Sequence, residues 1–437
     1  MRKNLFLLAT IVLSGAMLSC SSSDDDVDLG EAKTVVNMLS ESIPIRLTQE
    51  QQVFANDNNR FTLNFLKTVN DGDQSGQSFI YSPLSITYVL GMVNDAATGQ
   101  TEQELEQTLG FHEGGIQAVN DYCKNLIEGL PKVDEKVTLN IANAIFLNKD
   151  WTLKPQFEQD MQTYYNAKAE ALDFTASSTL DHINGWCDEK TKGMIPKILD
   201  AVEPNMVTYL LNAIYFKADW TSKFDTKNTK NESFSKEKGE GSTTLPMMRQ
   251  NVLINYLKND TYRAIEMPYG NGSWKMTVML PEEGKTTDDI INRLANCGIL
   301  EGNGFCGTMG DNYDHYEVDL KLPRFETSSD TDLVPGRLIG LMQKMGIHLA
   351  FDRQFAEIPN MCEGPIYINM MRQKARIKVN EEGSEAAAVT IAGGMYTSGI
   401  GPIEYPTATF HANRPFVYVI SELRTGIILF VGKFTGM

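Results

Sequence analysis

Apolar and polar positions along this chain follow two periods, and each period occupies its own stretches. Apolar residues three or four positions apart, the spacing of one helix face, recur in residues 85–97, 101–111, 182–192 and 333–347. Short apolar or alternating runs, typical of β-strands, occupy residues 207–217, 274–281, 316–325, 376–380, 415–422 and 426–434. The strands follow one another in groups with few strand–helix–strand alternations, which predicts an α+β fold with a largely antiparallel sheet.

Two of these stretches allow sharper predictions. The run "VTYLLNAIYFK", residues 207–217, is apolar at consecutive positions, so we expect a central strand that is covered on both faces. Thr101 and Glu104 have the spacing of a capping box, in which both side chains bind free amides at a helix start. This spacing predicts that the second helix begins close to Thr101.

Composition places the chain among ordinary folded proteins. Its 437 residues are 42% apolar and 22% charged, and length alone suggests about three domains. The formal net charge is −17, which disfavours nucleic acid or an anionic lipid surface as a partner, because like charges repel. We therefore expect a soluble folded body that does not bind nucleic acid.

The N-terminus differs from that body. Arg2 and Lys3 precede the apolar run "LFLLATIVLSGAML", which is too short for a comfortable membrane span and suits a signal peptide over residues 1–19. The polar, acidic stretch that follows has no apolar period, so residues 20–50 are predicted to be a solvated tether. The chain is therefore expected to be exported, with one folded part over residues 51–437.

The end of the signal run, "MLSC", resembles the cleavage motif of bacterial lipoproteins. This resemblance implies that Cys20 becomes the lipidated first residue of the mature protein and anchors it to a membrane. The acidic run behind Cys20 resembles that of surface lipoproteins in the Bacteroidetes, which implies an outer-membrane or cell-surface location. The alternative is ordinary cleavage near Ala16, which leaves Cys20 as a free thiol and the protein secreted.

Cysteines and histidines give no metal or cofactor signal. With Cys20 lipidated, five of the six cysteines remain, and an odd number argues against a disulfide framework. Cys297 and Cys306 lie nine residues apart; a disulfide and two separate thiols are both open. No CxxC or HExxH pair occurs and the five histidines are scattered, so we expect no metal and no cofactor.

Three short motifs are set aside. "GNGFCG", residues 302–307, lacks the preceding buried strand of a phosphate-binding turn. "DGDQSG", residues 71–76, starts like a calcium loop, but Ser82 stands where a bidentate carboxylate is needed. Ser398 in "YTSGIG" does not match GxSxG and has no base nearby in the sequence. We therefore do not expect an enzyme.

From about Phe54 to Met437 the chain resembles the serpin family. The resemblance is carried, in the family's order, by "FIYSPLSI" with "LGMVNDAATGQTEQELEQTLGF", "NAIYFKADWTSKFD", "EMPYGNGSWKMTVMLP", "LKLPRFE", "KVNEEGSEAAAVT" and "NRPFVYVI" with "TGIILFVGK". It implies one domain with three mostly antiparallel β-sheets, eight or nine helices and an exposed reactive-centre loop over about residues 381–413. This replaces the length-based estimate of three domains.

The resemblance also implies a suicide-substrate mechanism. In inhibitory serpins a target protease cleaves the exposed loop, which then inserts into the main sheet as a new strand and traps the acylated protease. The hinge of that loop would comprise Glu381, Gly383, Ser384, Ala386, Ala387, Ala388, Val389 and Thr390. Composition alone, with three alanines and Glu385, favours a solvent-exposed helix or linker for this stretch instead.

The order of residues in the hinge supports insertion independently of the family. A strand alternates its side chains between two faces, so Ser384, Ala386, Ala388 and Thr390 would share the inward face. All four are small and uncharged, and Glu385 falls on the outward face, where its charge stays solvated. Gly383 supplies a flexible pivot. The hinge is therefore predicted to be competent for insertion.

Four further residues match family positions around the opening of the sheet. Ser82 and Ser85 resemble the small polar residues beneath the strands that must separate, and Asn212 is expected to bond across that gap. Trp220 resembles the tryptophan at the top, where insertion begins. Each of the four equally fits ordinary satisfaction of a buried polar group. Where serpins often have a histidine, this chain has Gln373, which does not titrate near neutral pH.

The residue before the cleaved bond decides which protease is trapped. Seventeen residues counted from Glu381 place the bond between Thr397 and Ser398, with Tyr396 and Met395 as alternatives because the loop is about seven residues longer than in well-known serpins. No Lys or Arg occurs from Ile391 to Phe410, so serine proteases of the elastase, chymotrypsin or subtilisin type are expected, with cysteine proteases as a further class. We expect a monomer. The alternative is a non-inhibitory serpin that acts as a binding or chaperone-like protein.

Overall fold

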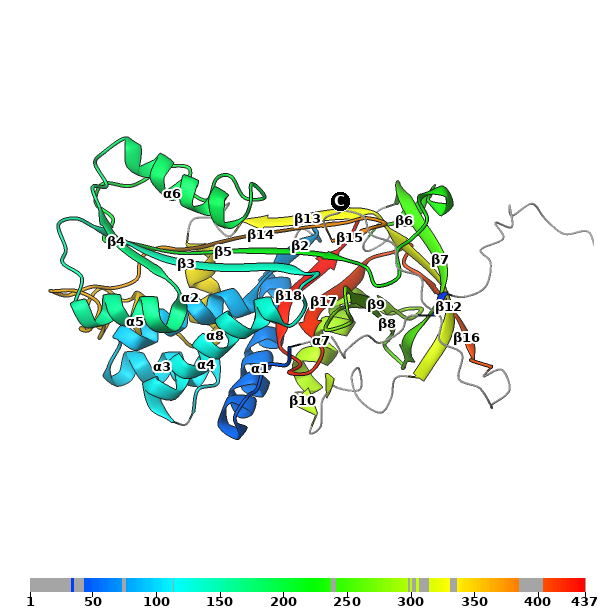
Figure 1. The fold of residues 1–437 in the computed structure, drawn as a ribbon, viewed down its shortest axis with the longest axis horizontal. Helices are drawn as coiled ribbons and strands as arrows, with labels where there is room; N and C mark the ends of the chain where they lie inside the picture. Colours follow the sequence, from blue (N-terminus) through cyan, green and yellow to red (C-terminus); the bar gives the residue numbers. More distant parts are fainter. Residues whose placement is uncertain are drawn as a thin grey trace, which may run out of the picture.

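Two large β-sheets and a group of helices below one of them make up the molecule (Figure 1). The computed structural model describes residues 33–34, 43–72, 76–112, 114–236, 241–297, 299–300, 304–305, 314–330, 336–384 and 404–436. These residues contain eight α-helices: α1 (Gln49–Gly72), α2 (Pro83–Ala96), α3 (Gly99–Leu109), α4 (Gly115–Gly129), α5 (Pro155–Tyr165), α6 (Ser178–Lys190), α7 (Thr287–Cys297) and α8 (Arg337–Met345).

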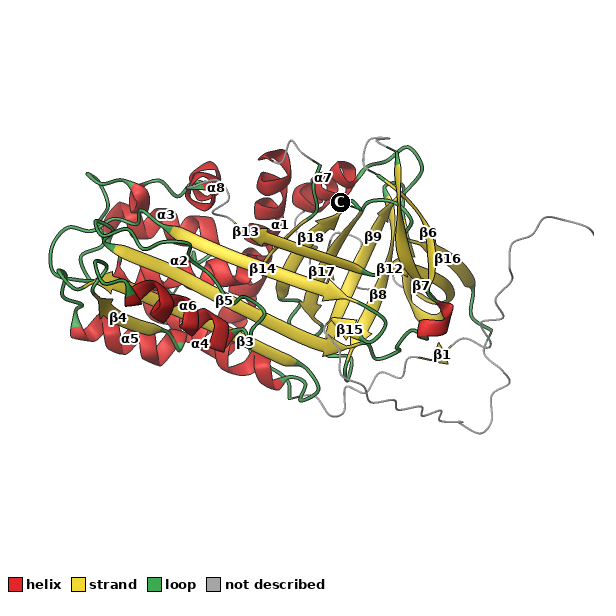
Figure 2. Cartoon of the chain, turned by 90° about the horizontal axis from the view of Figure 1, so that it is seen from above, coloured by secondary structure: helices red, strands yellow, loops and turns green. Residues whose placement is uncertain are grey.

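The six-stranded sheet has the order β13-β14-β15-β5-β3-β4. Its strands are β3 (Thr138–Asn148), β4 (Lys168–Leu172), β5 (Thr208–Asp219), β13 (Phe325–Asp330), β14 (Met371–Val379) and β15 (Gly383–Ser384). Helix α6 lies on one face of this sheet, and helices α2, α4 and α5 lie on the other (Figures 1 and 2).

Strand β5 is covered on both faces, as its apolar sequence predicts. Leu210 and Ile214 belong to the main core, while Leu211 and Ala213 belong to a second apolar cluster that includes Trp186 of α6. Side chains alternate between the two faces of a strand, so successive residues of β5 enter different clusters. This double burial makes β5 a central strand.

The second sheet has ten strands in the path β16-β12-β7-β8-β9-β17-β18-β2, with β1 and β6 also paired to β7. The strands are β1 (Lys33–Thr34), β2 (Phe79–Tyr81), β6 (Lys230–Ser235), β7 (Ser242–Lys258), β8 (Tyr262–Tyr269), β9 (Trp274–Pro281), β12 (Asp314–Pro323), β16 (Thr407–His411), β17 (Phe416–Glu422) and β18 (Ile428–Phe434). The short β10 (Ile299–Leu300) and β11 (Gly304–Phe305) pair with each other.

Most strand pairings are antiparallel. The parallel exceptions among the described residues are β1 with β7, β12 with β16, β3 with β4, and β14 with β5. The predicted α+β class with mostly antiparallel sheets is therefore confirmed, and eight helices agree with the expected eight or nine.

The predicted capping box at Thr101 is wrong. Helix α3 begins at Gly99 after Thr98, and both side chains bind other segments: Thr101 Oγ1 accepts from the amide of Glu357, and Glu104 Oε2 accepts from the amides of His348 and Leu349. Thr101 and Glu104 have the spacing of a capping box, but both side chains form their hydrogen bonds with residues that are distant in the sequence. By contrast, α2 is capped locally by Ser82, whose side chain accepts from the amide of Ser85.

The predicted signal peptide and the lipidation site Cys20 lie outside the described residues, so both stay predictions. Within the predicted tether, Lys33 and Thr34 pair in parallel with Val252 and Leu253 of β7. In the part of the chain that the structure describes, no helix is long and apolar enough to cross a membrane.

The described cysteines that can be classified, Cys123, Cys187 and Cys362, are buried free thiols. Cys306 lies outside the described residues, so its pairing with Cys297 is untested. Over the described ranges, no group of histidine, cysteine and acidic residues could hold a metal ion.

Candidate functional site

The boundary between β5 and β14, called the seam below, is only partly closed by pairing. The two strands run parallel and pair where Met371, Gln373 and Lys374 face Leu210, Asn212 and Ala213. Beyond Lys374, the short strand β15 lies between them at the far end: Ser384 pairs with Ala218 of β5 and with Val379 of β14. The first hinge residues therefore already occupy the mouth of the seam.

Gly383 approaches the backbone of β5 so closely that no side chain fits. A Cβ atom on Gly383 would lie 2.1 Å from the carbonyl oxygen of Ala218 and 2.6 Å from Cα of Asp219, well inside van der Waals contact. Glycine is required here because the backbones must approach. Gly383, which is predicted to be a pivot because of its backbone freedom, is thus also the residue that lets the chain turn into the sheet.

Ser384 points into the molecule. It is 1% exposed, and its Oγ lies 2.8 Å from the hydroxyl of Tyr269. The Tyr269 ring stacks on the Trp220 indole at 4.3 Å between centroids. This position corresponds to the inward face predicted from the alternation. The helix that composition favours is contradicted for Gly383 and Ser384. Residues 385–403 lie outside the described residues. They hold the rest of the hinge and the predicted bond between Thr397 and Ser398, with its alternatives Met395 and Tyr396.

Trp220 binds the backbone on the other side of the turn. Its Nε1 donates to the carbonyl of Asn380 at 2.9 Å, and its amide donates to the carbonyl of Glu382 at 2.8 Å. The indole therefore lies beneath the mouth of the seam, stacked on Tyr269 and bonded to the chain that leaves β14. Both interactions hold the turn between β14 and β15 against the end of β5.

The two glutamates of that turn are fixed by ion pairs. Glu381 is 3% exposed and accepts hydrogen bonds from both Nε and Nη2 of Arg324, while the hydroxyl of Thr229 donates to the same carboxylate. Burial alone would raise the pKa of Glu381, but these hydrogen bonds lower it below its usual value. Glu382 pairs with Lys223 at 2.7 Å.

Sequence reasoning missed Arg324, Lys223, Thr229 and Tyr269. All four lie far from the hinge in the sequence and reach it only because their segments converge there. Arg324 stands in the quoted motif "LKLPRFE", directly after Pro323 near the end of the predicted strand over residues 316–325, and this position was the available signal.

Beneath the seam, Gln373 joins β14 to the start of α2. Its Oε1 accepts from the amide of Ser82 at 3.1 Å, and its Nε2 donates to the carbonyl of Ser82 at 2.8 Å. Ser85 donates through Oγ to Ser82 Oγ at 3.0 Å. An amide both accepts and donates at every pH that a protein tolerates, so this connection does not depend on protonation.

Asn212 does not bond across the seam, and that expectation is wrong. Its Nδ2 donates to Oδ1 of Asn143 on β3 at 2.8 Å, and Asn143 in turn donates to the carbonyl of Tyr165 in α5 at 3.2 Å. Its Oδ1 has no hydrogen-bond partner. The side chain thus connects β5 to its other neighbour, away from β14, and leaves the seam free of one bond that strand separation would have to break.

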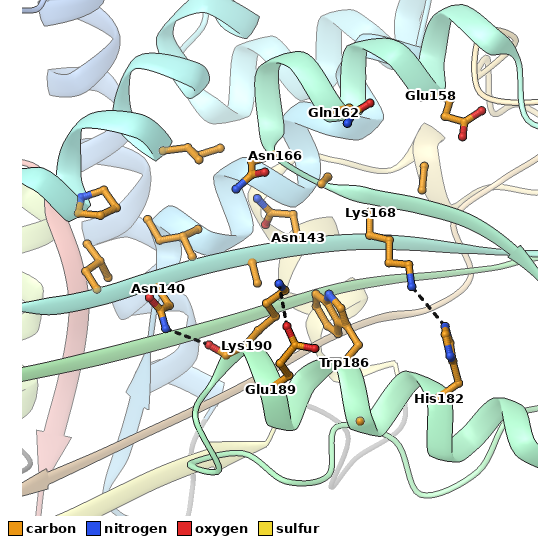
Figure 3. A pocket seen from close by; sticks show the side chains of 18 of the residues that line it. Asn140, Asn143, Glu158, Gln162, Asn166, Lys168, His182, Trp186, Glu189 and Lys190 are labelled. Carbon is orange, nitrogen blue, oxygen red and sulfur yellow. Dashed lines mark hydrogen bonds and ion pairs between the residues drawn. The ribbon is translucent and has the colours of Figure 1, made fainter.

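A cavity of about 1060 Å³ lies beside β3, between α5 and α6 (Figure 3). Its lining is mostly polar, with Asn140, Asn166 and Lys168 among the residues around it. Asn143, which binds Asn212, also lines it. None of the described hinge residues, Glu381, Gly383 and Ser384, lines this cavity, so we regard it as separate from the site at the seam.

Comparisons with known proteins match the chain to one family. A family model described as "Serpin (serine protease inhibitor)" matches residues 56–436. The chain is 29% identical over 389 residues to Serpin B6 of Pongo abelii, covering 88% of this chain and 99% of that protein. It is 30% identical over 385 residues to the leukocyte elastase inhibitor of Xenopus tropicalis, covering 86% and 97%.

Solved structures show the same architecture. Human thyroxine-binding globulin in complex with thyroxine matches with a TM-score of 0.73 at 25% identity, over 88% of this chain and 98% of that one. The thermophilic serpin Tengpin in its native state matches with a TM-score of 0.74 at 24% identity, over 94% and 98%. With the family model spanning the folded part and relatives matched over nearly their whole length, the chain belongs to the serpin family.

Proposed function

We propose that this protein is a suicide-substrate inhibitor of serine proteases. The single observation that carries the proposal is the placement of Gly383 and Ser384 as strand β15 at the mouth of the seam, with Ser384 buried on the inward face. After cleavage of the loop, the freed strand continues from β15 along the seam. Strand β5 then has a new neighbour, and the pairing of β5 with β14 is replaced by pairing with the inserted strand.

The proposed targets are proteases of the elastase, chymotrypsin or subtilisin type, cut near Thr397–Ser398. The absence of Lys and Arg from residues 391–410 supports a pocket that does not require a cation. The likeness to leukocyte elastase inhibitors supports the first of these types. We also propose that Cys20 is lipidated and holds the inhibitor at the cell surface, where labelled palmitate should be incorporated by the full chain and not by Cys20→Ser.

The test is incubation with elastase, chymotrypsin and subtilisin in separate reactions. A covalent complex that survives a denaturing gel is expected, together with a released C-terminal peptide whose first residue identifies the cut bond. Cleavage without a complex for all three proteases would favour the alternative, a non-inhibitory serpin that acts as a binding or chaperone-like protein.

Ser384→Arg tests the insertion step. The buried hydroxyl faces Tyr269, so an arginine at this position would place a charge against the aromatic pair, and insertion should become costly. We expect the variant to be cleaved as a substrate, with at least about a tenfold loss of complex, a cost of roughly 1.4 kcal/mol or more.

Glu385→Arg is the matched control, since the alternation places residue 385 on the outward face, where a charge stays solvated. It should still form the complex. Equal inhibition by Ser384→Arg and Glu385→Arg would show that the inward face does not control insertion.

A further inference from the structure

Arg372 is a buried guanidinium on the outer face of β14. Its side chain is 2% exposed, whereas the neighbouring Gln373 points to the opposite face and binds α2. A buried cation is costly unless it is paired and hydrogen-bonded. The partners of Arg372 therefore indicate which parts of the fold it joins.

One partner lies on the adjacent strand. Nε and Nη2 of Arg372 donate to the two carboxylate oxygens of Asp330 on β13 at 3.0 and 2.7 Å. Strand β13 pairs with β14 along its length, on the side away from β5. This bidentate pair neutralises the guanidinium within the β13–β14 side of the seam.

The second partner belongs to the segment that leads from α6 into β5. Nη2 of Arg372 also donates to Oδ2 of Asp200 at 3.2 Å. Hydrogen bonds from Lys197 and Arg372 lower the pKa of Asp200, so the carboxylate is ionised at neutral pH. Two residues along β14, Nζ of Lys374 donates to the backbone carbonyl of Lys197 at 2.8 Å.

The same segment packs on β5. Ile198 and Leu199 are buried in the apolar cluster that contains Leu211 and Ala213 of β5. The segment therefore binds β5 through apolar contacts and β14 through polar ones. It spans the seam at the level where Met371–Lys374 pair with Leu210–Ala213, at the end opposite β15, where the two strands must still separate before a strand can insert completely.

We infer that the Asp200–Arg372 ion pair, through the segment that carries Asp200, holds β5 and β14 together across the seam and limits the rate of strand insertion. This inference rests on the proposed function, because insertion is the step that it regulates. When the strands separate, Asp330 moves with β14 and its pair with Arg372 persists. Asp200 remains with β5, so its pair with Arg372 has to break. Arg372 is a positioning residue in this step.

The experiment measures insertion without a protease. A synthetic peptide with the sequence of residues 384–397 is incubated with the intact protein, and the fraction of protein that has bound it is followed by native gel electrophoresis. Asp200→Ala leaves the bidentate Asp330 pair in place, so no buried charge is left unpaired. We expect peptide uptake to be about two- to fivefold faster than in the wild type, the range for a pair with one exposed partner.

Lys197→Ala is the matched control. It removes the exposed ion pair between Lys197 and Asp200 at 3.0 Å but leaves the backbone carbonyl that Lys374 binds and leaves Asp200 free to bind Arg372. Its uptake rate should equal that of the wild type. An unchanged rate in Asp200→Ala, or an equal increase in both variants, would overturn the inference.

A second measurement separates insertion from general stability. In protein whose loop has been cleaved and inserted, β5 and β14 are no longer neighbours, so Asp200→Ala should unfold in urea at the same midpoint as the cleaved wild type. An equal loss of stability in the intact and cleaved forms would assign Asp200 a purely structural role. Failure of the wild type to form a complex with any protease would refute the proposed function alone, since peptide uptake requires no protease.

Discussion

Single residues at the seam show how burial decides the chemistry of a side chain. Glu381 and Arg372 are both charged and almost fully buried, and each has an oppositely charged partner bound through at least two hydrogen bonds. Gln373, in the same strand, satisfies a backbone amide and a carbonyl at once. An unpaired buried polar group would cost several kcal/mol. Each of these side chains therefore has a hydrogen-bond partner from a neighbouring segment of the fold.

Asp95 at the end of α2 makes the stability of the protein depend on pH. Burial raises the pKa of Asp95 to about 6, although a hydrogen bond from Asn120 opposes this change. A carboxyl whose pKa is raised on folding favours the folded state when protonated. Its contribution to the free energy of unfolding is therefore full below about pH 4 and is lost as pH rises through 6. Asp95→Asn should remove this dependence.

The measurement is the free energy of urea unfolding at pH 4.5 and at pH 7. Between these values the wild type should lose stability relative to Asp95→Asn by about 1 kcal/mol, since a tenfold difference in proton affinity between the folded and unfolded states corresponds to about 1.4 kcal/mol and solvent screens part of the effect at this partly exposed carboxyl. Parallel pH profiles for the two proteins would contradict the assignment.

At the scale of elements, the turn between β14 and β15 is held by contacts from the residue that follows β5, from β8 and from the residue that precedes β13. Trp220 and Tyr269 lie beneath it, and Arg324 pairs with Glu381 at its start. The short β15 pairs with only two residues of β5, so these side chains supply most of its anchoring. The first turn of the loop is therefore fixed by its neighbours.

Arg324→Ala should release this turn. Glu381 would keep Thr229 but lose its charged partner in a site that is 3% exposed, which destabilises the intact form by about 1–2 kcal/mol, because the partly exposed arginine is screened by solvent. The urea midpoint of the intact form should fall, and the loop should be cut faster by proteases that are not targets.

Arg376→Ala provides the control for Arg324→Ala. Arg376 of β14 pairs with Glu326 of β13, and both side chains are more than 40% exposed, so this pair joins the same two strands without reaching the hinge. The urea midpoint and the rate of loop cleavage of Arg376→Ala should change little. An equal effect of the two variants would mean that the pairing of β13 with β14, and not the hold on Glu381, sets stability.

Helices and strands that depend on local sequence patterns are easier to predict than those that depend on contacts between distant segments. The strands β5, β9, β17 and β18 agree with their predicted ranges to within about three residues, because apolar runs bounded by turns are local signals. Helix α1 was not predicted, although it has 24 residues. Polar residues such as Asn58 and Asn59 occupy buried positions in it, and their partners Thr87 and Gly426 lie in distant segments.

At the scale of the whole molecule, the pairing between β5 and β14 is incomplete in the intact form. Strands β5 and β14 pair over four residues at one end and are bridged by β15 at the other. A strand inserted between them would gain backbone hydrogen bonds on both sides. In the mechanism that we propose, the loop is joined to the sheets at both ends, through β15 and β16, so insertion waits for cleavage and the intact protein is kinetically trapped.

Cleavage of the loop should therefore raise heat stability. About ten new backbone hydrogen bonds at roughly 1 kcal/mol each correspond to an increase in Tm on the order of 20 °C. The check is a calorimetric scan before and after a trace of protease has cut the loop. A cleaved protein with the Tm of the intact one would show that the strand does not insert.

The sequence by itself determined the α+β class, the double burial of β5 and the inward position of Ser384, because a strand's alternation is set by local backbone geometry. Only the tertiary structure decided the partners: Asn143 for Asn212, Arg324 for Glu381 and Asp200 for Arg372, which are 69, 57 and 172 residues apart. A charged or amide side chain accepts many partners of the right chemistry, and the folded chain selects one by deciding which strands lie side by side.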